Sequence, residues 1–357
     1  MLLPKPGRMR PEYLDMPTVY VASDQARAGK TAACVTLAHH MAQEGKKVAL
    51  FKPFCLQTRA GETDPDVQIL RQAANVQEAE AAPWPIALPH DGDLRELPVD
   101  RALGAFREAT TGADISIVEG LSGLRDSLGL ASNHLAEALD ATVMVVIGYT
   151  PDLAVEEVLG TKRLFGDRLA GVILNGVTRY KLREVRAKLV PRIEAEGVKV
   201  LAVIPDDRRL LGVTVGQLAQ HLDGKFLNWA EKRDNFVEHF LIGGMTLDWG
   251  VWYFERFSNK AVIVRGDRPD IQMAALATPT SCIVLTGGHP PIQYVNYEAM
   301  EEEVPLIQVE TDTLSTVAAL ESLQEEALFD HPLKQEQFRE LMSQHGDWEA
   351  LYRSLGL

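Results

Sequence analysis

The chain has 357 residues, and at roughly 150 residues per domain this length predicts about two domains. Hydrophobic residues make up 46% and charged residues 24%, which argues against the disordered, collagen-like and coiled-coil classes. The net charge of −14 makes the chain a poor candidate for wrapping nucleic acid or an anionic membrane.

The charge is unevenly distributed along the chain. Residues 1–60 hold nine basic and four acidic residues, so this segment is basic within an acidic protein. The pattern predicts a small anionic ligand near the N-terminus. The three cysteines are widely spaced, which favours a reducing compartment, and the proline-rich N-terminus does not resemble a signal peptide. No apolar run reaches the 18 residues that a membrane-spanning helix needs. We therefore expect a cytoplasmic protein without a membrane segment.

Short buried-type strands alternate with helices over the first 205 residues. The predicted strands are 18–23, 47–51, 114–118, 142–147, 170–174 and 198–203. The predicted helices are 31–44, 65–74, 99–110, 131–139, 151–164 and 181–196, and the proline-rich stretch 83–98 is expected to be a surface excursion. Because the strands are continuous runs of Val, Ile, Leu and Ala, they predict a parallel sheet covered on both faces.

A second and shorter α/β series follows a polar junction at 206–235. Its predicted strands are 261–264, 282–285 and 305–309, and its predicted helices are 246–256, 270–277, 291–302 and 313–324. The remaining tail is charged and helical, and we expect it to pack on the fold rather than to bind a partner. The expected divisions are 1–16 (an N-terminal extension), 17–224, 225–324 and 325–357 (the tail).

The segment between the first strand and the first helix is typical of a phosphate-binding loop. Residues 23–31 read Ser-Asp-Gln-Ala-Arg-Ala-Gly-Lys-Thr. Ala28 and Gly29 would let the backbone approach a phosphate, Lys30 would reach the β- and γ-phosphate oxygens, and the Thr31 hydroxyl would ligate Mg²⁺. The motif usually begins with glycine where this chain has Asp24, which places a negative charge near the phosphates and leaves nucleotide affinity open.

Polar residues follow several of the predicted strands, at the edge of a parallel sheet where ligands bind. Lys52 would contact the γ-phosphate or a substrate, or would be a surface lysine. Thr31, Asp66 and Glu119 together would supply the hard oxygen ligands that Mg²⁺ prefers. Asn175 would pair with an adenine edge, or would be a turn residue. Lys30 and Lys52 are therefore the candidate catalytic residues, with ATP and Mg²⁺ as cofactors.

The order of these motifs resembles a known family. The loop, followed by Phe-Lys-Pro, Asp-Pro-Asp, Val-Glu-Gly and Leu-Asn-Gly, is similar to the dethiobiotin synthetase-like ATPase domain that also begins many bacterial phosphotransacetylases. The stretch 201–218 looks like the phosphotransacetylase branch. In that family the acetyltransferase fold is a separate C-terminal domain, so the resemblance implies no acetyltransferase activity for this chain.

The second α/β series resembles the DRTGG domain of the same family, although Pro-Asp-Ile-Gln follows Asp-Arg here. Its strands end in Gly or Asp, which predicts an effector pocket with Arg268 as an anion clamp. The predicted pocket residues are Asp267, Arg268, Gly287, Gly288 and Asp312. The alternative is that these residues only form tight turns and helix caps.

The expected fold class is thus α/β, with a parallel-sheet P-loop NTPase domain followed by a smaller α/β DRTGG-like domain and a C-terminal helical tail. The resemblance implies an ATP-binding regulatory protein that senses a small anionic metabolite and acts on a partner enzyme, with slow ATP hydrolysis as a variant. The alternatives are an ATP-dependent carboxylase or ligase of the dethiobiotin synthetase type, and a structural module with a degenerate loop. A homo-oligomer is the default expectation for such a fold.

Overall fold

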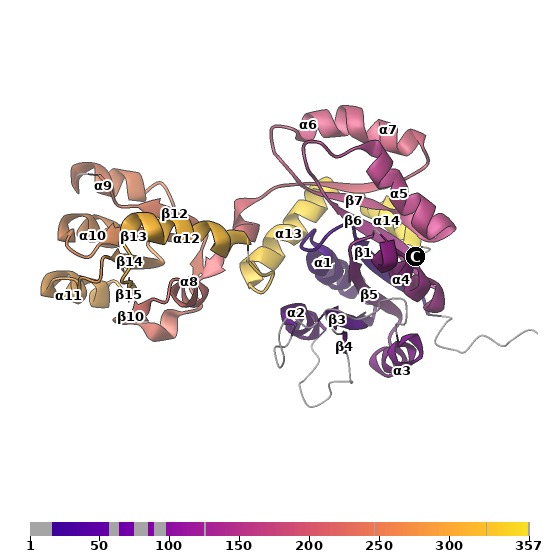
Figure 1. Ribbon diagram of the computed structural model, residues 1–357, viewed down its shortest axis with the longest axis horizontal. Helices are drawn as coiled ribbons and strands as arrows, with labels where there is room; N and C mark the ends of the chain where they lie inside the picture. Colours follow the sequence, from indigo (N-terminus) through magenta and orange to yellow (C-terminus); the bar gives the residue numbers. More distant parts are fainter. Residues whose placement is uncertain are drawn as a thin grey trace, which may run out of the picture. The chain divides into compact units, whose positions relative to one another are not determined.

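The chain forms two compact units, which are residues 1–206 with 335–357, and residues 207–334 (Figure 1). The computed structural model describes residues 16–56, 64–74, 85–88, 98–124, 126–245, 247–325 and 327–355. Most of the predicted N-terminal extension and of the predicted surface excursion at 83–98 therefore lies outside the described residues. No helix in the described ranges is both long and apolar enough to cross a membrane.

The first unit is built on a six-stranded sheet in the order β2-β5-β1-β6-β7-β8, and every neighbouring pair is parallel. The strands are β1 (Thr18–Ser23), β2 (Val48–Phe51), β5 (Ile115–Ser122), β6 (Thr142–Gly148), β7 (Leu169–Val177) and β8 (Val200–Pro205). All six residues of β1 are buried, because helices cover both faces of a sheet of this kind. The predicted parallel sheet is confirmed, with β1 near its centre.

Helices connect successive strands of this sheet. They are α1 (Lys30–Gln43), α2 (Pro65–Ala73), α3 (Val99–Ala109), α4 (Asp126–Ala138), α5 (Val155–Phe165), α6 (Leu182–Glu184) and α7 (Val190–Ala195). A π-helical turn, Val185–Leu189, joins α6 to α7 just before Pro191, whose ring nitrogen has no N–H to donate. The structure also contains a short parallel pair, β3 (Phe54–Leu56) with β4 (Ile86–Leu88), that the sequence did not predict.

The second unit has a five-stranded sheet in the order β10-β15-β14-β13-β12, in which only β10 is antiparallel to its neighbour. Its strands are β10 (Lys225–Phe226), β12 (His239–Ile242), β13 (Lys260–Arg265), β14 (Cys282–Thr286) and β15 (Leu306–Gln308). A separate antiparallel pair joins β9 (Val213–Thr214) to β11 (Phe236–Val237). The helices of the second unit are α8 (Val215–His221), α9 (Leu247–Phe254), α10 (Pro269–Leu276), α11 (Gln293–Glu301) and α12 (Thr313–Glu325).

Two hydrophobic clusters lie on opposite faces of this second sheet, because successive strand residues point to opposite sides. Ala261 and Ile263 of β13 pack in one cluster with residues of α8 and α12. Val262 and Val264 pack in the other with residues of α10 and α11. Since α8 supplies Leu218 to this core, the second unit begins before the boundary predicted at residue 225.

The C-terminal tail consists of α13 (Pro332–His345) and α14 (Trp348–Leu355), and residues from 335 onward belong to the first unit. Helix α14 packs on β7 and β8. Lys199 Nζ donates hydrogen bonds to the carbonyl oxygen of Ala350 at 3.0 Å and to Ser354 Oγ at 2.8 Å. The tail is thus an integral element of the first unit.

Candidate functional site

The predicted phosphate loop lies between the end of β1 and the start of α1. Its last residue, Gly29, has a left-handed backbone with φ 104°. A Cβ atom at this position would lie 2.5 Å from Asn175 Nδ2, so the loop needs glycine for both its torsion and its packing. The N-terminal turn of α1 follows directly, and its first N–H groups have no partner within the helix. Strand, loop and helix therefore have the arrangement that binds phosphate in P-loop proteins.

Asn175 at the end of β7 holds the loop in place. Its Nδ2 donates a hydrogen bond to the carbonyl oxygen of Ala28 at 2.8 Å. A bidentate adenine contact by Asn175 would have to give up this bond, and that contact stays a prediction. The structure thus indicates a positioning role for Asn175, acting through the backbone of the loop.

Asp24 also fastens the loop to the neighbouring strand β6. Its Oδ1 accepts a hydrogen bond from the backbone N–H of Gly148 at 3.1 Å, and its own N–H donates to the carbonyl oxygen of Val146 at 3.3 Å. Burial raises the pKa of the Asp24 carboxyl, and the hydrogen bond from Gly148 only partly offsets this effect. The loop therefore keeps its place next to β6 with aspartate at the usual glycine position.

The two candidate lysines are both buried side chains. Lys30 Nζ donates a hydrogen bond to Ser122 Oγ at the end of β5. Lys52 follows β2 and its Nζ lies 2.9 Å from Asp64 Oδ2, 2.9 Å from Asp66 Oδ2 and 3.1 Å from Glu119 Oε1. Burial alone would lower the pKa of Lys52, but the three carboxylates raise it above its usual value. Lys52 is thus a buried cation and not a surface lysine.

Asp64 and Ser122 belong to this arrangement, but the sequence reasoning did not assign them to the site. Asp64 is the N-cap of α2, and its Oδ1 accepts a hydrogen bond from the backbone N–H of Asp66 at 3.0 Å. Asp64 thus caps the helix with one carboxylate oxygen and contacts Lys52 with the other. The Asp-Pro-Asp pattern signals the cap, but no local pattern marks Ser122.

Glu119 is the most deeply buried carboxylate at this edge of the sheet, with 1% of its surface exposed. Burial raises the pKa of its carboxyl, while the nearby Lys52 ammonium opposes that shift. Its Oε1 is paired with the Lys52 ammonium at 3.1 Å, whereas its Oε2 has no hydrogen-bond partner among the described residues. An unsatisfied acceptor is costly in a buried site, and a cation would satisfy it.

This observation tests the predicted Mg²⁺ ligands Thr31, Asp66 and Glu119. Thr31 and Glu119 are buried, and Lys52 Nζ contacts both carboxylates of the set. Among the residues that the structure describes, no three His, Cys, Asp or Glu side chains are arranged to hold a metal ion. One hydroxyl and two carboxylates still suit Mg²⁺, which usually keeps several waters and takes further ligands from phosphate.

The residues predicted for an effector pocket lie at the carboxyl edge of the second sheet, and several have partners there. Arg268 donates to Asp270 Oδ1 at 2.9 Å and to Asp270 Oδ2 at 2.8 Å. Asp267 is paired with Arg265, and Asp312 Oδ1 accepts from the N–H of Ser315 at 2.8 Å. Gly287 and Gly288 have positive φ angles of 83° and 69°, as tight turns require. These contacts favour turns and caps, and the pocket stays a prediction.

Comparison with protein families matches the chain to two models. The model described as an AAA domain matches residues 17–214, and the model described as a DRTGG domain matches residues 217–323. The chain is 24% identical to the phosphate acetyltransferase of Haemophilus influenzae, over 92% of this chain and 51% of that protein. It is 26% identical to the phosphate acetyltransferase of Pseudomonas putida, over 96% of this chain and 52% of that protein. The chain therefore spans about half the length of the curated relatives it matches.

Among solved structures, the signal recognition particle receptor FtsY of Elizabethkingia anophelis is 19% identical, with a TM-score of 0.38 over 54% of this chain and 59% of the other. The CBS and DRTGG domains of Clostridium perfringens pyrophosphatase, complexed with diadenosine tetraphosphate, give 14% identity and a TM-score of 0.28. That alignment covers 48% of this chain and 85% of the other. By its matched models and its parallel α/β architecture, the chain belongs to the AAA-domain family of P-loop proteins, and its AAA and DRTGG domains fit the N-terminal part of a phosphotransacetylase.

Proposed function

We propose that the first unit binds Mg·ATP at the loop between β1 and α1. The observation that carries this proposal is the left-handed Gly29 packed against Asn175, directly before a helix whose first side chain is the buried Lys30. A loop of this form presents backbone N–H groups and a lysine to the same anion. The basic character of residues 1–60 supports an anionic ligand here.

Thr31, Asp66 and Glu119 would hold Mg²⁺ beside the nucleotide, where the ion would neutralise charge on the phosphates. The buried Oε2 of Glu119, which has no hydrogen-bond partner among the described residues, supports this assignment. Lys52 would then move its ammonium from the carboxylates toward the γ-phosphate, because a divalent ion and an ammonium compete for the same oxygens. Lys30 and Lys52 would both contact the phosphates.

The test is the melting temperature with and without excess Mg·ATP, in the parent chain and in Lys30→Ala. At one hundred times the dissociation constant, binding should stabilise the folded chain by about 2.7 kcal/mol. We expect a shift of a few degrees in the parent and none in Lys30→Ala. The exposed Lys46→Ala is the matched control and should respond as the parent does. No shift in the parent would favour the degenerate loop, for which Asp24 is the specific observation.

We also infer a regulatory role, in which nucleotide in the first unit alters the second unit and thereby a partner enzyme. The support is the pairing of an AAA domain with a DRTGG domain in a chain similar to phosphate acetyltransferases. Hydrogen exchange of the second unit, measured with and without Mg·ATP, tests this coupling. Unchanged exchange in β12 to β15 at saturating nucleotide would contradict it.

A small anionic metabolite at Arg268 would be the effector in this proposal. Such an anion has to replace Asp270 on the guanidinium, so Asp270→Asn should strengthen binding and Arg268→Gln should abolish it. Titration with inorganic phosphate, followed by NMR shifts of the Arg268 side chain, measures both effects. Equal phosphate affinity in all three chains would exclude a site at Arg268.

A further inference from the structure

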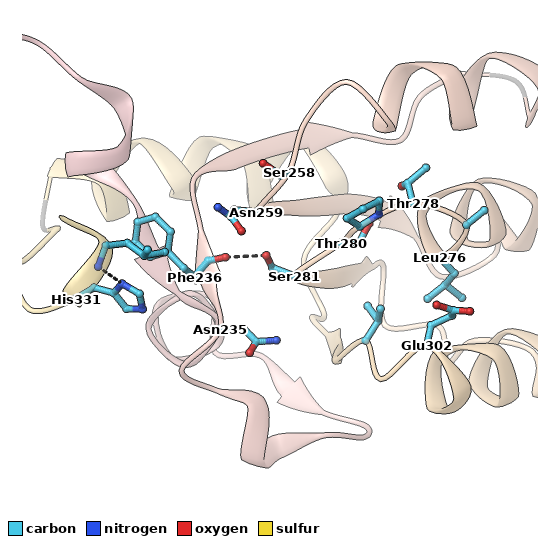
Figure 2. A pocket seen from close by; sticks show the side chains of 14 residues that line it. Asn235, Phe236, Ser258, Asn259, Leu276, Thr278, Thr280, Ser281, Glu302 and His331 are labelled. Carbon is cyan, nitrogen blue, oxygen red and sulfur yellow. Dashed lines mark hydrogen bonds between the residues drawn. The ribbon is translucent and has the colours of Figure 1, made fainter. Parts of the chain in front are cut away.

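A cavity of about 650 Å³ lies at the amino-terminal edge of the second sheet, opposite the edge where ligands usually bind in such folds. Its lining includes Asn259 and Ser281, which directly precede β13 and β14. Figure 2 shows these side chains together with Asn235, Thr280 and Glu302 around one space. The volume is within the range of small-molecule sites.

Three hydroxyl groups of the lining already donate their protons to the backbone. Thr278 Oγ1 and Thr280 Oγ1 donate to the carbonyl oxygen of Ala275 at 3.0 and 2.8 Å, and Ser281 Oγ donates to that of Phe236 at 2.7 Å. A hydroxyl used in this way keeps only its acceptor lone pairs. The cavity wall is therefore richer in acceptors than its composition suggests, and it suits a ligand that donates hydrogen bonds.

The charges around the cavity favour a positive ligand. None of its 14 lining residues is a lysine or an arginine, whereas Glu302 contributes a carboxylate. Helix α10 ends at Leu276 and α11 ends at Glu301, so the C-terminal ends of two helices point their partial negative charge toward this edge. Residues 207–334 hold 19 acidic and ten basic residues, so the whole unit carries a net charge of −9.

Two further groups lie at this edge. Lys260 Nζ is fully buried and donates to the carbonyl oxygens of Phe257 and Pro279, so its hydrogen bonds are made to the backbone and its side chain does not line the cavity. Burial lowers the pKa of His331, whose Nδ1 accepts a hydrogen bond from the N–H of Leu333 at 3.2 Å. His331 is therefore a neutral part of the wall, stacked on Phe236 with the ring centroids 4.5 Å apart.

We propose that this cavity binds a small hydroxylated amine, with the ammonium near Glu302 and the hydroxyl groups on the Thr278, Thr280 and Ser281 oxygens. The site is separate from the phosphate loop and from the predicted anion pocket at the opposite edge of the same sheet. Its ligand class also differs from both, because it is cationic. The proposal does not depend on nucleotide binding by the first unit.

The experiment compares three probes that share one sugar scaffold and differ in charge, which are glucosamine, glucose and glucose 6-phosphate. Binding to the full chain is measured by isothermal titration at neutral pH. We expect glucosamine to bind about tenfold more tightly than glucose, because its ammonium makes charge-assisted hydrogen bonds. Glucose 6-phosphate should bind more weakly than either. Equal affinities, tighter binding of the phosphate, or no binding of any probe would overturn the proposal.

Two variants test whether glucosamine binds in this cavity. Glu302→Gln should weaken glucosamine binding about threefold, because an exposed carboxylate contributes modestly. Glu301→Gln, at the exposed last residue of α11, is the matched control. Ala277→Trp adds a large ring to the lining at an exposed helix C-cap and should abolish binding while the melting temperature is kept. Unchanged binding in Ala277→Trp would place the amine elsewhere and refute the site.

Discussion

Asp24 stands where a phosphate loop usually has glycine, and its carboxylate accepts a hydrogen bond from Gly148. Because an amide oxygen can accept the same hydrogen bond, Asp24→Asn removes the charge and keeps the bond from the Gly148 N–H. We predict that Asp24→Asn lowers the dissociation constant for Mg·ATP about fivefold, since one negative charge beside the phosphates is lost. Isothermal titration measures this change, and the exposed Asp167→Asn at the opposite end of the sheet is the control.

The pH dependence adds a second measurement on Asp24. Burial raises the pKa of its carboxyl, so this group gains a proton at a higher pH than an ordinary aspartate does. Acidification should therefore tighten nucleotide binding more in the parent than in Asp24→Asn. If the two chains had equal affinities over the whole pH range, the charge of Asp24 would have no influence on the loop.

Lys52 is the counterion of three carboxylates, and its removal leaves them uncompensated. We predict that Lys52→Met lowers the free energy of unfolding by about 3–5 kcal/mol in a metal chelator. Added Mg²⁺ should recover part of this loss in the variant, because the ion takes the position of the ammonium. Urea unfolding with chelator and with Mg²⁺ measures both effects, and Lys46→Met serves as an exposed control. A variant that Mg²⁺ does not stabilise would argue against a cation site at Glu119.

At the scale of elements, the sequence predicted those strands of the two sheets that are continuous apolar runs. Such runs are recognisable because buried parallel strands need apolar residues along their whole length. It missed β3, β4, β9, β10, β11 and β12, which have only two to four residues each and are too short to show a periodicity. The phosphate loop was predictable because its function depends on local spacing. The sequence also placed Lys52, Asp66 and Glu119 at the same edge of the first sheet, because polar residues follow its strands. It did not predict their ion pairs or the cavity at the amino-terminal edge of the second sheet, since those contacts depend on the folded structure.

Lys260, the first residue of β13, makes the stability of the second sheet dependent on pH. Lys260 is fully buried, and burial lowers its pKa from 10.5 to about 8. Between these values the unfolded chain keeps the proton that the folded chain has lost, so the free energy of unfolding rises with pH in this window. We predict that Lys260→Met removes this rise while other titrating groups stay in place. Urea unfolding of both chains at several pH values measures the difference, and parallel pH profiles would contradict it.

At the scale of the whole molecule, the chain leaves the first unit after residue 206 and returns to it at residue 335. The AAA-domain match ends at residue 214, so the returning segment lies outside the matched range although it packs on β7 and β8. The sequence predicted that residues 325–357 pack on the fold, but not on which unit, because a charged helix carries no mark of what it packs against. The structure makes α14 a stabilising part of the nucleotide-binding unit that we propose.

This arrangement predicts which unit responds to a cavity in α14. Leu351 is buried in that helix, with 1% of its surface exposed, so Leu351→Ala should lower the free energy of unfolding by about 2–5 kcal/mol. The loss should appear as faster hydrogen exchange of β7 amides with little change in β13. Ile263→Ala, an equally buried position in the second core, should show the reverse pattern. If Leu351→Ala instead accelerated exchange in β13, the tail would stabilise the second unit, and its assignment to the first unit would be wrong.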